Sequence, residues 1–81
     1  MSPQDVSSFL CAQLRSIKPT LPEVVPTQAH YRNDLCVDSL DLVELVARIE
    51  QRFGFPIVDA DLSTFVNLDA TTEFILNRIR A

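Results

Sequence analysis

The sequence predicts a small all-α domain: a four-helix bundle with three main helices, one short helix, and a long loop between the first two. Three observations lead to this fold class. The chain has 81 residues, which is enough for one domain only. Its apolar residues recur at helical spacing in several segments. No stretch alternates between apolar and polar residues for long enough to predict a strand. We therefore treat residues 1–81 as a single domain with a small core.

The first helix is expected to run from Pro3 to about Lys18. Ser2 is a favourable N-cap residue, and proline suits the first helical position. The residues at helical spacing behind it are Val6, Phe9, Leu10, Leu14 and Ile17. Pro19 disfavours a helical conformation at the residue before it, so the helix should end there.

A long irregular connection is expected over residues 18–37. Pro19, Pro22 and Pro26 interrupt regular structure there. Such a long connection is uncommon unless it is functional or packed by its own side chains. The residues available for that packing are Leu21, Val24, Val25, Tyr31 and Leu35. His30, the only histidine, has no neighbour at metal-ligand spacing, and we interpret it as a solvated loop residue.

The second helix, from about Ser39 to Phe53, gives the strongest signal. Either Asp38 or Ser39 could be its N-cap, and Gly54 can end it in a left-handed conformation. A helical wheel places one apolar stripe on the side that a core needs: Leu42, Leu45, Val46, Ile49 and Phe53. A second apolar stripe lies on a different face and is bordered by carboxylates. It consists of Leu40, Val43 and Ala47.

Two interpretations of this second stripe remain open. It could be part of a wide core face that other helices cover on both sides. It could instead be a docking face, where apolar side chains make the central contact and carboxylates meet a basic rim on a partner. We favour docking, because few helical segments exist to cover the stripe and its acids resist burial.

The last third of the chain predicts a short helix and a final main helix. Asp59 can cap the short helix, which should continue to about Thr64 with Leu62 and Phe65 as anchors. Asn67 or Asp69 can cap the final helix. The expected inner face of that helix is Leu68, Thr72, Ile75 and Ile79. Thr72 would need a hydrogen-bond partner if it were buried.

The charge distribution narrows the class of partner. The net charge is −4, and the segment from Asp34 to Glu73 holds nine acids against two bases, Arg48 and Arg52. This surplus argues against nucleic acid and favours partners with basic surfaces. We find no signal peptide and no apolar run of membrane-spanning length. We therefore expect a cytoplasmic monomer, without membrane insertion, whose two cysteines, Cys11 and Cys36, are free thiols.

Ser39 could have either of two roles. It could simply cap the second helix, or it could be an attachment point, because a phosphate ester there would lie at a helix N-terminus that favours an anion. No histidine, lysine or second serine is placed to activate it as a nucleophile. The chain also lacks a metal cluster and a nucleotide loop, so we predict neither an enzyme nor a metal site.

The sequence around Ser39 resembles the acyl carrier proteins. Residues 34–46 read D-L-C-V-D-S-L-D-L-V-E-L-V and are similar to the family pattern D-L-G-x-D-S-L-D-x-V-E-L-V. The likeness extends over essentially the whole chain. It implies that Ser39 is esterified to 4'-phosphopantetheine by a phosphopantetheinyl transferase, and that the thiol of this arm carries an acyl group as a thioester.

The resemblance also implies a set of partners and contact residues. The partners would be synthases, reductases, dehydratases and acyltransferases of fatty acid or polyketide-type biosynthesis. The positions that match the family's recognition helix are Asp38, Leu40, Asp41, Val43, Glu44, Ala47 and Glu50. The residues that could shelter the acyl chain, or simply form the core, are Leu42, Leu45, Val46, Phe53, Ile57, Leu62, Phe65, Leu68 and Ile75.

Departures from the pattern leave some alternatives open. Cys36 replaces the usual glycine and is expected to be a small buried thiol. Arg48, Gln51 and Arg52 replace residues that are often acidic, which suggests a carrier for a particular synthase. A peptidyl or aryl carrier is one alternative. An unmodified helical adaptor that docks through the second helix is the other, and such an adaptor would not need Ser39.

Overall fold

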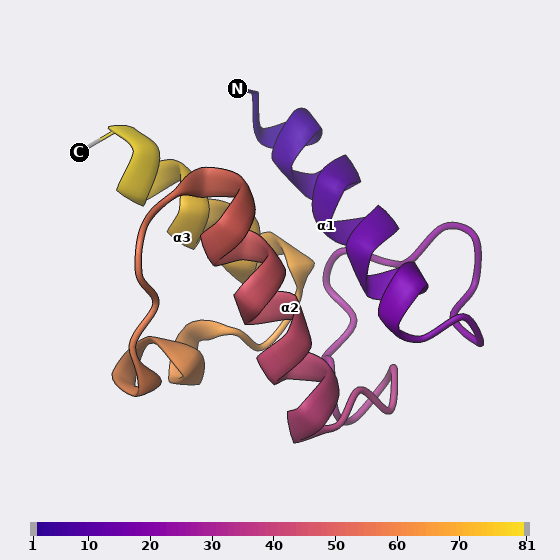
Figure 1. The fold of residues 1–81 in the computed structure, drawn as a ribbon. Coiled ribbons are helices and arrows are strands. Elements are labelled where there is room, and N and C mark those ends of the chain that lie inside the picture. Colours follow the sequence, from indigo (N-terminus) through magenta and orange to yellow (C-terminus); the bar gives the residue numbers. More distant parts are fainter. Residues whose placement is uncertain (1, 81) are drawn as a thin grey trace.

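The computed structural model describes residues 2–80 and contains four helical elements in the predicted order. These are α1 (Pro3–Ile17), α2 (Ser39–Phe53), the short 3-10 helix η1 (Asp59–Thr64) and α3 (Leu68–Arg80). Figure 1 shows α1 and α2 side by side and running in opposite directions, with α3 behind α2 and a long loop from the end of α1 to the start of α2. Helix α1 packs against both α2 and α3. Because the described residues contain no strand, the all-α prediction is confirmed.

The helix ends lie where the capping residues predicted them. Ser2 and Asp5 form a reciprocal capping box at the start of α1, with both hydrogen bonds at 3.2 Å. Gly54 ends α2 with a φ of 78°, a left-handed conformation that costs glycine little. The Asn67 side chain accepts the Ala70 N–H at 2.8 Å, so Asn67 caps α3 and Asp69 does not. Local capping chemistry therefore fixes the start of each main helix and the end of α2.

The core is assembled from one face of each main helix and from the long loop. Its buried apolar residues are Val6, Leu10, Leu14, Leu21, Val25, Tyr31, Leu35, Val37, Leu45, Ile49, Phe65, Leu68, Ile75 and Leu76. Each large apolar side chain that is fully buried contributes roughly 1.5–3 kcal/mol relative to its exposed state. Val24 was expected in this group but is 81% exposed, because Val25 takes the inward position next to it.

The long loop is fixed mainly through Tyr31, which is fully buried. Its backbone N–H donates to the Val66 carbonyl at 2.9 Å, and its own carbonyl accepts the Val37 N–H at 2.7 Å. The Thr71 hydroxyl lies 2.8 Å from the Tyr31 hydroxyl and donates to the Asn67 carbonyl. Since Thr71 has a single hydroxyl proton, Tyr31 is the donor in their contact. Tyr31 thus ties the loop to the start of α3.

Two expectations for α3 need correction. Ile79 is 39% exposed, because the buried face of α3 ends one turn earlier, at Leu76. Thr71, which was not expected on the inner face, is fully buried near the start of α3. Its contact with the Tyr31 hydroxyl satisfies its own hydroxyl there. Thr72 is buried as expected, but its hydroxyl has no hydrogen-bond partner among residues 2–80.

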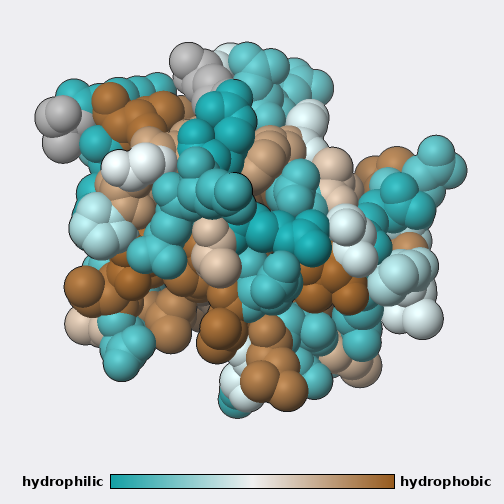
Figure 2. Space-filling view, in the orientation of Figure 1, coloured by the Kyte–Doolittle hydropathy of each residue, from teal (hydrophilic) through white to brown (hydrophobic). Residues whose placement is uncertain are grey.

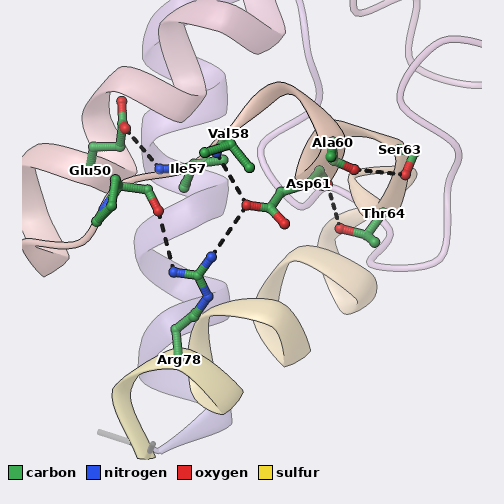
Figure 3. A network of polar contacts seen from close by, with 9 residues as sticks. Glu50, Ile57, Val58, Ala60, Asp61, Ser63, Thr64 and Arg78 are labelled. Atoms are coloured by element: carbon green, nitrogen blue, oxygen red, sulfur yellow. Dashed lines mark hydrogen bonds and ion pairs between the residues drawn. The ribbon is translucent and has the colours of Figure 1, made fainter.

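The segment from Gly54 to Thr64 is anchored by carboxylates at both sides (Figure 3). Glu50 of α2 accepts the Ile57 N–H at 2.9 Å, and Asp61 accepts the Val58 N–H at 3.2 Å. Asp59 was expected to cap η1, but it is the first residue inside this helix and Val58 occupies the N-cap position. The Asp61 carboxylate accepts the Val58 N–H instead. Arg78 of α3 donates to Asp61 at 3.3 Å and so joins η1 to α3.

Candidate functional site

The start of α2 is capped by two aspartates. The Asp38 carboxylate accepts the Asp41 N–H at 2.9 Å, and the Asp41 carboxylate accepts the Asp38 N–H at 3.2 Å. This reciprocal box leaves no capping task for Ser39, which is the first residue inside the helix. Of the two candidates for the cap, the structure therefore selects Asp38.

Ser39 is exposed, and its hydroxyl makes no hydrogen bond within residues 2–80. The hydroxyl lies in the first turn of a 15-residue helix, where the unpaired amides and the helix dipole favour a negative charge. An enzyme can reach it without displacing a protein contact. The residue thus fits a phosphate ester both sterically and electrostatically.

A cavity of 360 Å³ opens beside Ser39. It lies between the loop, the first turns of α2 and the segment that contains η1, and most of its surface is apolar. Its lining residues are His30, Tyr31, Arg32, Ser39, Leu42, Val43, Leu62, Ser63, Phe65 and Val66. An arm attached to Ser39 would have an apolar recess within immediate reach.

Three residues predicted to shelter a chain line this cavity, namely Leu42, Leu62 and Phe65. Leu45, Leu68 and Ile75 are instead buried in the core. The long loop and the residues around η1 supply the lining positions that sequence reasoning missed: His30, Tyr31, Arg32, Ser63 and Val66. No local pattern marks them, because only the folded chain brings the loop beside η1.

The second apolar stripe of α2 points away from the core. Leu40 is 78% exposed, Val43 is 58% exposed and Ala47 is also exposed, so none of them belongs to a wide core face. Figure 2 shows apolar surface gathered along the lower edge of the molecule, where α2 begins in Figure 1. An exposed apolar patch of this kind, next to charged residues, is typical of a docking surface.

The carboxylates beside this stripe differ in their surroundings. Glu44 is exposed and forms an ion pair with Arg48 at 3.1 Å. Asp41 is half-buried and serves the capping box. Glu50 is also half-buried, and its contact with Ile57 gives it a structural role beside any docking role.

The comparisons with known proteins agree with this geometry. A family profile described as "Phosphopantetheine attachment site" matches residues 9–75. The acyl carrier protein of Cyanidium caldarium is 44% identical over 74 residues, which are 91% of this chain and 81% of that protein. This chain belongs to the acyl carrier protein family. A domain of this family carries covalent 4'-phosphopantetheine and performs no catalysis itself.

Other relatives differ in length. Acyl carrier protein 2, mitochondrial, of Arabidopsis thaliana is 31% identical over 77 residues, or 95% of this chain, which spans only 61% of that protein's length. The acyl carrier protein of Thermosynechococcus vestitus is 37% identical over 60 residues, or 74% of each chain.

Within residues 2–80, the chain described here has no helix long and apolar enough to cross a membrane and no group of three potential metal ligands.

The backbone conformation at Cys36 explains why the acyl carrier pattern has glycine three residues before the serine. Its φ is +56°, and it is the only non-glycine residue with positive φ in the described chain. It is exposed, so the expectation of a buried thiol was wrong. The turn into α2 uses a left-handed conformation at this position, which a residue with a Cβ adopts at a cost of about 1–2 kcal/mol.

Cys36→Gly should therefore stabilise the protein, by up to about 1 kcal/mol after the extra freedom of glycine in the unfolded chain is subtracted. For a domain of this size, that corresponds to a rise in melting temperature of about 4–8 °C at most. Thermal unfolding of both proteins measures it. Cys36→Ala is the matched control, because it removes the thiol but keeps the Cβ. If both variants gained equal stability, the backbone explanation would be wrong.

Proposed function

We propose that Ser39 is the residue that takes the 4'-phosphopantetheine group, and that the protein carries acyl intermediates on it for fatty acid or polyketide-type biosynthesis. The observation that supports this most directly is that different residues cap α2 and offer a free hydroxyl at its start. Asp38 caps the helix, while Ser39 is exposed beside an apolar cavity. Capping alone therefore does not account for the serine.

Attachment requires little of the carrier itself. A phosphodiester bond forms between Ser39 Oγ and the phosphate of the arm, while the phosphoanhydride bond of coenzyme A breaks and adenosine 3',5'-bisphosphate leaves. The serine proton leaves to a base on the transferase in this proposal. His30 and Ser63 line the same cavity, but no side chain among residues 2–80 forms a hydrogen bond with Ser39 Oγ. The new phosphate then lies at the N-terminus of α2, which stabilises an anion.

The cavity beside Ser39 is proposed to shelter the acyl chain. Leu42, Leu62 and Phe65 are among its apolar lining residues. A chain that enters this cavity binds only the folded state, so it should raise the melting temperature. We expect the loaded protein with a medium-length acyl chain to melt several degrees above the form with a free thiol. Calorimetry on the two forms measures this, and identical melting temperatures would remove the support for sheltering.

Partner enzymes are proposed to dock on the exposed stripe of α2 through basic surfaces. The contact would be made by Asp38, Leu40, Asp41, Val43, Glu44, Ala47 and Glu50. We expect Glu44→Lys to lower kcat/KM for transfer of the prosthetic group about tenfold at low salt, and less at high salt. Glu73→Lys, on α3, is the matched control with the same charge change and should react like the parent. Equal rates for the Glu44 variant and the parent at low salt would contradict the docking assignment.

We assign the protein to a reducing aqueous compartment, the cytoplasm. Cys11 and Cys36 form no disulfide within residues 2–80, which is consistent with a reducing compartment. The Arabidopsis relative and a Neurospora crassa relative are named mitochondrial. Fractionation of cells that express the natural gene product distinguishes the two compartments.

The experiment that tests the proposed function is intact mass spectrometry after incubation with coenzyme A and a broad-specificity phosphopantetheinyl transferase. The expected result is a gain of one phosphopantetheinyl group, which fragmentation assigns to Ser39. A folded protein that gains no mass would contradict the proposal and leave a helical adaptor that docks through α2. If the thiol of the attached arm were then loaded with an aminoacyl or aryl group in preference to a fatty acyl group, the peptidyl or aryl carrier would be favoured.

A further inference from the structure

A positively charged surface lies near the C-terminal end of α2. Its sign is opposite to that of the carboxylates that border the docking stripe. It is an open groove of 430 Å³ between α1 and α2, lined by Phe9, Gln13, Arg48, Gln51 and Arg52. We call these five residues the cationic groove. Arg52 is thirteen residues beyond Ser39, or about 20 Å along the helix axis. The groove is therefore separate from the cavity beside Ser39, yet close enough for one partner protein to cover both.

Arg48 is fixed in this groove by two contacts. Its Nε donates to Glu44 at 3.1 Å, and its Nη1 donates to the Gln13 side chain at 3.0 Å. The contact with Gln13 couples α1 to α2. The pair with Glu44 partly neutralises the acid at the centre of the docking stripe, so the negative charge offered to a partner is concentrated in the first turn of α2.

Arg52 is ordered by aromatic rings, and no carboxylate neutralises it. Its guanidinium carbon lies 5.9 Å from the centre of the Phe9 ring and 5.4 Å from that of Phe53. The two rings pack edge to face at 5.5 Å. Within residues 2–80, no acidic side chain forms an ion pair with Arg52. Stacking restrains the guanidinium but leaves its N–H groups free to bind a carboxylate in a bidentate manner.

From these observations we infer that the cationic groove docks a carboxylate-bearing segment of the partner protein. This inference rests on the proposed function, in that the partner approaches along α2. The preferred partner then has basic residues beside the entrance for the phosphopantetheine arm and Asp or Glu residues about 20 Å away. A partner with a uniformly basic surface would face Arg52 at that distance and be disfavoured by like-charge repulsion. The groove thus favours those partner enzymes whose surface carries acidic residues at this distance from the arm.

Two synthetic amphipathic helical peptides test this inference. They have identical apolar residues and differ only in carrying Glu or Lys at every charged position. Each is titrated at low salt into the isotopically labelled protein, with and without its prosthetic group, and backbone amide shifts are followed by NMR. We expect the Glu peptide to shift the amides of Phe9, Gln13 and Gln51, and the Lys peptide to shift those of Asp41 and Glu44.

Variants separate charge from packing. Arg52→Gln should weaken binding of the Glu peptide about five- to tenfold. Arg52→Lys should weaken it less, because lysine keeps the charge but not the stacked, bidentate geometry. Gln51→Glu should weaken the same peptide and leaves both arginines and their contacts in place, so it remains informative if Arg52→Gln is poorly folded. Arg80→Gln, outside the groove, is the matched control and should bind like the parent.

Two results would overturn the inference. One is a Glu peptide that shifts the groove amides no more than the Lys peptide does. The other is unchanged binding in both Arg52→Gln and Gln51→Glu. Because the unmodified protein is also titrated, failure of the groove is distinguishable from failure of Ser39 to gain its prosthetic group.

Discussion

Replacing Ser39 with alanine should abolish transfer of phosphopantetheine and leave the melting temperature almost unchanged. The hydroxyl is the proposed attachment point, so its loss removes the acceptor and no mass gain should remain. Stability should change by no more than about 0.5 kcal/mol, because Ser39 is exposed and alanine is favourable within a helix. Intact mass after the transferase reaction and thermal unfolding of the same sample measure the two quantities.

Asp38 should show the opposite behaviour, because it caps α2. Asp38→Ala should cost about 1 kcal/mol and lower the melting temperature by about 4–8 °C. Ser39 should still gain mass in this variant, but more slowly, because Asp38 is also a proposed docking residue. Asp38→Asn keeps a capping side chain and should retain most of that stability. Ser63→Ala removes a hydroxyl from the same cavity and should gain mass normally. Modification of the Ser39→Ala protein, or a large loss of its stability, would contradict the division of roles between Asp38 and Ser39.

The sequence predicts the features that depend on neighbouring residues. The starts of α1, α2 and α3 follow from Ser2, Asp38 and Asn67, and the end of α2 follows from Gly54. Each of these residues acts within one helical turn. The exposed stripe of α2 follows from helical periodicity alone. The identity of the α2 cap was ambiguous in the sequence, because Asp38 and Ser39 are both good capping residues and only the geometry distinguishes them.

Features that depend on contacts between distant segments could not be predicted in this way. Tyr31 and Thr71 are forty positions apart, and nothing near either residue indicates their hydrogen bond. The cavity beside Ser39 requires the loop and η1 to meet. The stacking of Arg52 on Phe9 requires α1 to lie beside α2. The sequence indicated Arg52 as an unusual charge for this family, but not that rings of two helices hold it in place.

The second large effect is expected at Tyr31 under alkaline conditions. Burial raises the pKa of this phenol from its ordinary value of 10.0 to about 12. The folded state therefore retains the phenol proton at a pH where the unfolded chain has lost it. The associated stability is fully present below pH 10 and is lost as the pH rises from about 10 to about 12. A shift of this size corresponds to roughly 3 kcal/mol, which is a large part of the total stability of a small domain.

Tyr31→Phe should lower stability by about 1 kcal/mol at neutral pH, where it loses the hydrogen bond to Thr71, and should remove the alkaline loss attributed to the phenol. Urea unfolding across this pH range measures the difference between parent and variant. Tyr31 is the only tyrosine, so phenolate absorbance reports its ionisation directly. Parallel loss of stability in parent and variant, or an ordinary titration midpoint while the protein is still folded, would contradict the assignment. The expected result would establish that the loop leading to Ser39 is anchored in part by a neutral, buried phenol, since ionising that group removes the proton that it donates to Thr71 of α3.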